Sequence, residues 1–91
     1  MNEKDFVALC KKTVADYTNK MLVKNAGKID RKFITENDVF IVWMCKTLQN
    51  SKALASTTLF DGMYYELTFN GNSGELYVDA YRKWENFTVV V

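Results

Sequence analysis

The sequence contains no histidine and no proline, and only four of its 91 residues are glycine. Without histidine, the chain lacks Ser–His and Cys–His nucleophile pairs, a histidine general base and histidine metal ligands. Because proline is absent and glycine is scarce, most of the chain can form regular secondary structure. We therefore expect a folded protein that is not an enzyme, with no catalytic residues, no cofactor and no metal site.

Other features are present only in small amounts. The two cysteines, Cys10 and Cys45, are too far apart for a Cys-x-x-Cys pair or a zinc knuckle. Both lie in apolar patterns, which predicts buried free thiols, although a disulfide between them stays open. No apolar run approaches the roughly 20 residues that cross a bilayer, and no signal peptide is visible. We expect a cytoplasmic protein that has no membrane partner.

The net charge of +1 is small, but the charges are unevenly distributed. Residues 1–35 carry eight Lys/Arg and four acids, whereas residues 36–91 carry four Lys/Arg and seven acids. One interpretation is a solvated helix beside a mildly acidic sheet. The other is a basic helix that meets phosphates, an acidic partner or the acidic face of a second copy.

The first part of the chain has the pattern of an amphipathic helix over residues 2–24. Asn2 can cap its N-terminus, and Gly27 can end it in a left-handed conformation. Its apolar stripe recurs at three- and four-residue steps: Phe6, Leu9, Cys10, Thr13, Val14, Tyr17 and Met21.

From Val39 the pattern changes to β-branched and aromatic residues, which favours a strand over 39–45. Thr35-Glu36-Asn37-Asp38 has the form of a capping box and is a competing signal for a helix. In strict alternation, one face of the strand carries Val39, Ile41, Trp43 and Cys45, and the other carries Phe40, Val42 and Met44.

Further strands are expected over 53–59, 63–69 and 75–81, with a last short strand over 87–91. Gln49-Asn50-Ser51, Asp61-Gly62 and the glycine-rich 70–74 read as the turns between them. This order predicts a single α+β domain over residues 1–91. Its N-terminal amphipathic helix packs on a four- to five-stranded antiparallel meander sheet.

The strand over 39–45 is apolar on both faces, but one helix covers only one face of a sheet. Either the C-terminal residues fold over the second face, or another protein does. Burying an uncovered apolar patch of several hundred Å² would favour association with another protein as strongly as a typical interface does. We therefore predict a homodimer or a partner protein.

Four acids could in principle support two-carboxylate catalysis: Glu66, Glu75, Asp79 and Glu85. Glu66 and Asp79 could face each other on adjacent strands. A simpler interpretation is that these acids are surface charges that pair with Lys52 or Arg82.

Tyrosine and tryptophan gather in the last two strands, and two lysines with polar amides flank the 46–52 turn. Such rings are common interface anchors and can also stack on nucleic-acid bases. The structural alternatives are core packing for the rings and a solvated turn for the amides. The candidate binding residues are Lys46, Gln49, Asn50, Lys52, Tyr64, Glu66, Asp79, Tyr81, Arg82 and Trp84.

Several stretches of the chain carry a resemblance to known sequences: Asn2-Glu3-Lys4-Asp5-Phe6, Val42-Trp43, Lys46-Thr47-Leu48-Gln49-Asn50, Lys52-Ala53-Leu54, Ser56-Thr57, Asp61-Gly62-Met63-Tyr64-Tyr65-Glu66, Asn70-Gly71 and Tyr77-Val78-Asp79-Ala80-Tyr81-Arg82-Lys83-Trp84-Glu85-Asn86. They resemble a family of small proteins of phages and prophages of Gram-positive bacteria, a domain of unknown function. Residues 24–36 are the least similar part. The resemblance implies a phage or prophage protein in the cytoplasm of a bacterial host.

Three functions are compatible with these observations. The first is a non-enzymatic accessory protein that binds a host protein, for host takeover or as an anti-defence inhibitor. The second is an oligomeric sponge that sequesters a nucleotide second messenger between Lys46, Lys52, Arg82 and stacking tyrosines. The third is a nucleic-acid-binding protein that uses the basic helix, which the low net charge disfavours.

Overall fold

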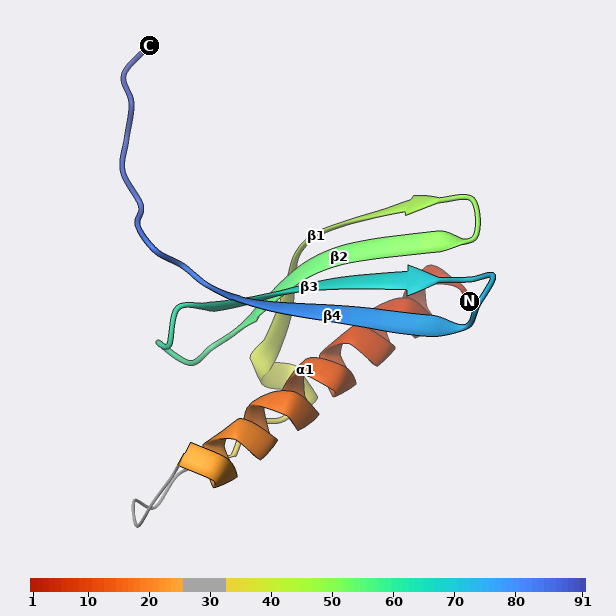
Figure 1. Ribbon diagram of the computed structural model, residues 1–91, viewed down its shortest axis with the longest axis horizontal. Helices are drawn as coiled ribbons and strands as arrows, with labels where there is room; N and C mark the ends of the chain where they lie inside the picture. Colours follow the sequence, from red (N-terminus) through yellow and green to blue (C-terminus); the bar gives the residue numbers. More distant parts are fainter. Residues whose placement is uncertain (26–32) are drawn as a thin grey trace.

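The computed structural model describes residues 1–25 and 33–91, and it confirms the predicted α+β fold with four strands (Figure 1). Gly27 lies outside the described residues, so its predicted role as a helix stop is not addressed. In chain order, the elements are α1 (Glu3–Asn25), η1 (Glu36–Asp38), β1 (Val39–Thr47), β2 (Asn50–Thr57), β3 (Met63–Asn70) and β4 (Glu75–Arg82).

The helix α1 begins where the sequence predicts it. The Asn2 side-chain oxygen accepts a hydrogen bond from the Asp5 N–H at 2.8 Å, and the Asn2 carbonyl accepts one from the Phe6 N–H at 3.0 Å. This cap satisfies N–H groups that a first helical turn otherwise leaves unpaired. The face turned to the sheet is built at three- and four-residue steps from the buried Phe6, Cys10, Val14, Ala15 and Thr18.

Residues 35–39 contain both of the structures that the sequence predicts there, first a short helix and then the start of a strand. Thr35 and Asp38 form the capping box, with the Thr35 N–H donating to the Asp38 carboxylate at 2.8 Å. The box caps only the short 3₁₀ helix η1, and β1 follows at once. The helical signal ends there because the β-branched and aromatic residues that follow favour an extended backbone.

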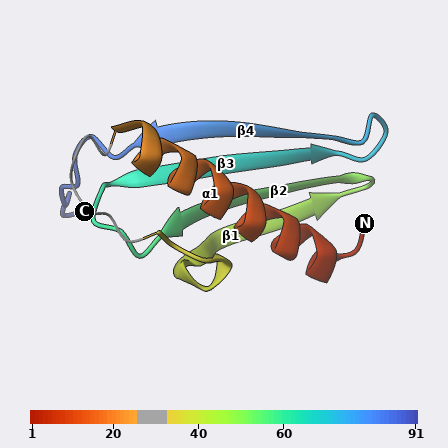
Figure 2. The same cartoon turned by 90° about the horizontal axis from the view of Figure 1, so that it is seen from below.

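The sheet is an open antiparallel meander in the order β1-β2-β3-β4, and α1 crosses one of its faces diagonally (Figure 2). The core lies between these two layers. In β2 and β3 it is formed by the alternate residues Ala53, Ala55, Tyr65 and Leu67. Two small alanines at the centre let the helix approach the sheet closely.

The predicted alternation of β1 is wrong after Ile41. Ile41 pairs with Ala55, but a register shift follows, so that Trp43 pairs with Leu54. An extra residue in one strand reverses the inside–outside alternation beyond it. Met44 therefore faces α1, and Trp43 lies on the opposite face with 45% of its surface exposed.

The predicted last strand over 87–91 does not form. The Lys83 N–H donates to the Gly62 carbonyl at 2.7 Å, and residues 84–91 then continue without regular structure. We call residues 84–91 the extended segment. It leaves the sheet on the side away from α1 and does not fold over the second face (Figure 1).

One of the two cysteine predictions is also wrong. Cys10 is fully buried in the core, but Cys45 is exposed near the end of β1. Both are free thiols. Cys45 follows Trp43 beyond the register shift, so it too lies on the face away from α1.

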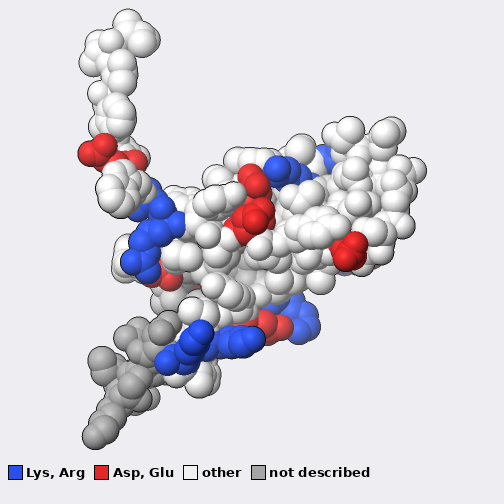
Figure 3. Space-filling model, in the orientation of Figure 1, with Lys and Arg blue, Asp and Glu red and all other residues white. Residues whose placement is uncertain are grey.

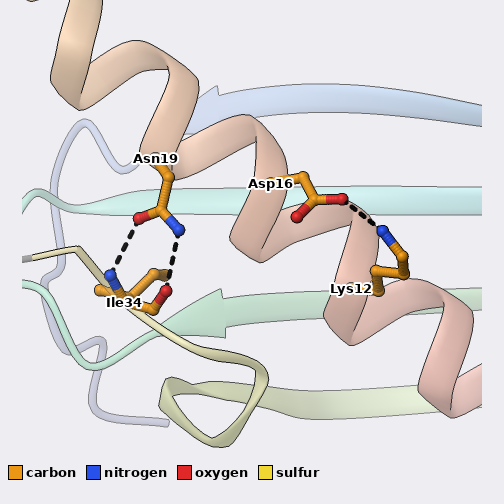
Figure 4. A network of polar contacts seen from close by, with 4 residues as sticks. All are labelled: Lys12, Asp16, Asn19 and Ile34. Atoms are coloured by element: carbon orange, nitrogen blue, oxygen red, sulfur yellow. Dashed lines mark hydrogen bonds and ion pairs between the residues drawn. The ribbon is translucent and has the colours of Figure 1, made fainter.

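The side chain of Asn19 fastens the chain that enters the sheet to the middle of α1 (Figure 4). It donates to the Ile34 carbonyl at 2.8 Å and accepts from the Ile34 N–H at 2.9 Å. The amide thus satisfies both backbone groups of one residue, as a neighbouring strand would. The exposed pair Lys12–Asp16, at 2.8 Å, lies one to two turns earlier on the helix.

Candidate functional site

The candidate site is the open face, which we define as the sheet surface turned away from α1. The strand register assigns it residues from all four strands: Phe40, Trp43, Cys45, Thr47, Asn50, Lys52, Leu54, Ser56, Tyr64, Glu66, Thr68, Asn70, Glu75, Tyr77, Asp79 and Tyr81. No element within residues 1–25 and 33–91 covers this face as a second layer (Figures 1 and 2).

Aromatic rings occupy both edges of the open face. Phe40 and Trp43 on β1 are 47% and 45% exposed, and Tyr77 and Tyr81 on β4 are 48% and 52% exposed. Tyr64 lies between the edges in the row Phe40, Ser56, Tyr64, Tyr81. The Lys83 ammonium group sits 5.9 Å from the centre of the Tyr64 ring, at a distance typical of a cation–π contact.

Three charged side chains, Lys52, Glu66 and Asp79, lie among the rings of the open face. Glu66 and Asp79 are direct neighbours on β3 and β4, as the sequence predicts. The Lys52 ammonium group lies 3.5 Å from a Glu66 carboxylate oxygen, which confirms the predicted cross-strand pair. Both partners are partly exposed, so the pair fixes side-chain positions more than it stabilises the fold.

The open face as a whole is slightly acidic. It carries Glu66, Glu75 and Asp79 against Lys52, with Lys83 beside it. In Figure 3, much of the visible sheet surface is uncharged, and basic groups gather along the helix and at the base of the extended segment. This face therefore offers aromatic area with a few fixed charges and no basic field.

The structure brings together only part of the predicted binding set. Lys52, Tyr64, Glu66, Asp79 and Tyr81 share the open face. Asn50, the first residue of β2, lies at the end of the same face, and Lys46, Gln49, Arg82 and Trp84 lie elsewhere.

Gln49 and Asn50 lie at the β1–β2 hairpin tip, where the Asn50 side chain accepts a hydrogen bond from the Gly71 N–H at 3.3 Å. Trp84 is 97% exposed on the extended segment. Lys46 pairs with Ser51 near one end of the sheet, and Arg82 pairs with Met63 near the other. The three cations of the nucleotide hypothesis therefore do not converge on one pocket.

Arg82 lines a groove between the C-terminal half of α1 and the sheet, which the sequence did not reveal. The groove has a volume of about 390 Å³, and its other lining residues are Tyr17, Thr18, Met21, Leu22, Asp61, Met63 and Tyr65. Tyr17 meets Tyr65 edge-on with ring centres 5.8 Å apart. Burial raises the pKa of Tyr65, whose hydroxyl lies 3.4 Å from the Thr18 hydroxyl.

Sequence reasoning missed Trp43, Phe40 and Tyr77 as site residues. Strict alternation placed Trp43 and Phe40 on opposite faces, and only the register shift in β1 unites them. Tyr77 carried a usable signal, because it alternates with Asp79 and Tyr81 along one strand and therefore shares their face.

Two kinds of feature are absent from residues 1–25 and 33–91. No three His, Cys, Asp or Glu side chains gather as a metal-ion site would require. No helix of this part of the chain is both long enough and apolar enough to span a membrane.

Comparison with known families finds one match, which covers residues 7–91 and is described as "Family of unknown function (DUF6275)". The chain belongs to this family. The match includes all four strands and nearly all of α1, so it covers the whole open face. No curated protein and no solved structure matches the chain.

Proposed function

We propose that this member of the family is a non-enzymatic accessory protein of a phage or prophage that binds a protein of its bacterial host through the open face. One observation carries the proposal: a full sheet face with aromatic rings at both edges is left uncovered by the part of the chain that the structure describes.

The size of the uncovered surface supports a protein partner. A fully buried aromatic ring removes roughly 150–250 Å² from water. Four edge rings, each about half exposed, therefore offer roughly 300–500 Å² of aromatic surface. This area is divided between the two edges of the face, and exposed aromatic rings of this kind are common anchors of protein interfaces.

The charges on the open face also suit a protein better than a phosphate-bearing ligand. Three carboxylates there would repel a nucleotide or a nucleic-acid backbone, and Lys52 is already paired with Glu66. Tyrosine and tryptophan combine apolar area with a polar tip, which is why they anchor protein interfaces. A protein partner with apolar groups opposite the rings and a basic group opposite Asp79 would complement this face.

The experiment is an affinity capture from infected or lysogenic cells with three forms of the purified protein. Wild type is compared with Trp43→Lys, which places a charge at the edge of the open face. Lys12→Ala is the control, because it alters an exposed side chain on the outer face of α1, away from the open face. Circular dichroism and thermal unfolding verify that all three forms fold alike.

We expect one dominant host protein to bind wild type and Lys12→Ala, and to be lost with Trp43→Lys. Direct titration of that protein should show at least about tenfold weaker binding to Trp43→Lys, the effect of an anchor that contributes over about 1.4 kcal/mol. A partner that tolerates Trp43→Lys but not Lys12→Ala would place the binding surface on α1. Steep salt dependence of binding to random DNA would favour the nucleic-acid function.

A further inference from the structure

The extended segment is the most unusual surface of the molecule. Its apolar side chains are far more exposed than such residues usually are in a folded domain: Trp84 is 97% exposed, Phe87 73%, Val89 68% and Val90 93%. Among the hydrogen bonds of the described residues, none joins residues 84–91 to the rest of the chain. The run Thr88-Val89-Val90-Val91 is β-branched throughout and favours a strand.

The two edges of the sheet carry different numbers of charged residues. Edge strands are commonly guarded by charged residues or proline. β4 carries Glu75, Asp79 and Arg82 along its length, but β1 has no charge before Lys46. Among the described residues β1 pairs only with β2, so its outer backbone groups have no strand partner there. The register shift between Ile41 and Trp43 leaves residues 43–47 as its regular five-residue stretch.

We propose that residues 87–91 of one copy add as a fifth strand to the outer edge of residues 43–47 in a second copy, and that the exchange is reciprocal. A donor segment and an acceptor edge with a single charged residue, Lys46, lie on the same chain. Two copies related by a two-fold axis can therefore make this strand pairing twice, once in each direction of exchange. The same sequence that fails to form a strand within its own chain then forms one between chains.

The dimensions allow this exchange without rebuilding β4. Residues 83–86 remain as the connection and span roughly 13 Å when extended. This exceeds the roughly 5 Å between neighbouring strands and the roughly 10 Å between packed sheets. The two segments are each five residues long, so full-register pairing in either strand direction brings Val89 opposite Cys45.

The charges and the area are also consistent with a second copy as the occupant. Lys46 is the only charged residue of β1, and Glu85 is the only one of the extended segment, so no like charges are brought together. Trp84 and Phe87 from two copies supply roughly 600–1,000 Å² of aromatic surface. The valines and the surfaces they cover bring the total toward the roughly 1,200–2,000 Å² of a stable interface. The exchange shares Trp43 with the open face, but its proline test changes only residues of the extended segment.

The first test measures the mass of the full chain in solution by light scattering. Wild type should have twice the chain mass of 10.5 kDa. The variant Val89→Pro with Val90→Pro should be monomeric and folded. Successive N–H groups point to opposite sides of a strand, so one of the two prolines must face the acceptor edge. A monomeric wild type, or a dimer that survives both prolines, would overturn the proposal.

The second test locates the acceptor edge by cross-linking under mild oxidation. In a Cys10→Ala background, Val89→Cys should form a disulfide with the native Cys45, because opposed strand residues lie within disulfide distance. The product should run as a dimer on a non-reducing gel. The matched control moves the acceptor thiol to β4, by Cys45→Ala with Tyr77→Cys. Cross-linking only in the control, or only within one chain, would refute the assignment to β1.

Discussion

Single residues at the two hairpin tips show how closely separate parts of this sheet approach one another. A Cβ atom added at Gly71 would overlap the carbonyl oxygen of Gln49, which belongs to the β1–β2 tip. The Gly71 N–H also donates to the Asn50 side chain. The sequence Asn70-Gly71 predicts a turn, but it does not reveal that the glycine is required by contact with a second turn.

We expect Gly71→Ala to destabilise the fold by roughly 2–3 kcal/mol, because the Gln49 backbone must move and the hydrogen bond to Asn50 is weakened. The measurement is chemical unfolding followed by circular dichroism. Gly74→Asn is the control: Gly74 has a φ of +70°, which asparagine tolerates, and no atom lies within 4 Å of its added Cβ. Equal stability of wild type and Gly71→Ala would mean that the two tips do not touch.

Because of Cys10, the stability of the fold should depend on pH in the alkaline range. Burial raises the pKa of its thiol from 9.0 to about 11, because the core disfavours the thiolate. Below pH 9 the thiol is neutral in both the folded and unfolded chains, and its contribution to stability is fully present. As the pH rises toward about 11, the unfolded chain ionises first and this contribution is lost.

The free energy of unfolding should therefore fall more steeply between pH 9 and 11 for wild type than for Cys10→Ala, by roughly 2–3 kcal/mol over the interval. Urea unfolding at several pH values measures both slopes. Tyrosine and lysine ionisation affects both proteins, so the difference isolates Cys10. Parallel curves would show that the thiol is already ionised or exposed in the folded chain.

Among the elements, α1 holds the entry to the sheet as well as covering it. Asn19 makes two hydrogen bonds to the backbone of Ile34, while the neighbouring Lys12–Asp16 pair is exposed and joins α1 only to itself. Asn19→Ala should lower stability by about 1–3 kcal/mol, since it leaves two partly buried backbone groups without their partner. Thermal unfolding should show little change for Asp16→Ala. A similar effect of both substitutions would contradict the anchoring role.

The behaviour of β1 explains where prediction of the elements failed. Its β-branched residues correctly predict a strand, and the Thr35–Asp38 capping box correctly predicts a helical start. The inserted residue after Ile41 has no local sequence signal, because it depends on how β1 meets β2. The predicted faces were consequently reversed for Trp43 and Met44, and Trp43 was lost from the predicted site.

The molecule as a whole is less compact than its length suggests. Its radius of gyration is 14.8 Å, whereas a compact domain of this length has about 12 Å. Two features account for the difference: a sheet with only one covered face, and a segment that extends away from it. Both leave apolar surface in water, and this is why we assign one to a host protein and the other to a second copy.

The local sequence pattern was sufficient to predict the helix and the four strands. Helical and strand periodicity, the Asn2 cap and the turn residues act over a few neighbours, and these are all present in the linear sequence. The pairing of Glu66 with Asp79 followed from the turn between their strands. The reversed faces of β1, the exposed Cys45 and the unpaired residues 84–91 depend on contacts between distant parts of the chain. Such contacts form only when the layers pack, so they could be known only from the folded molecule.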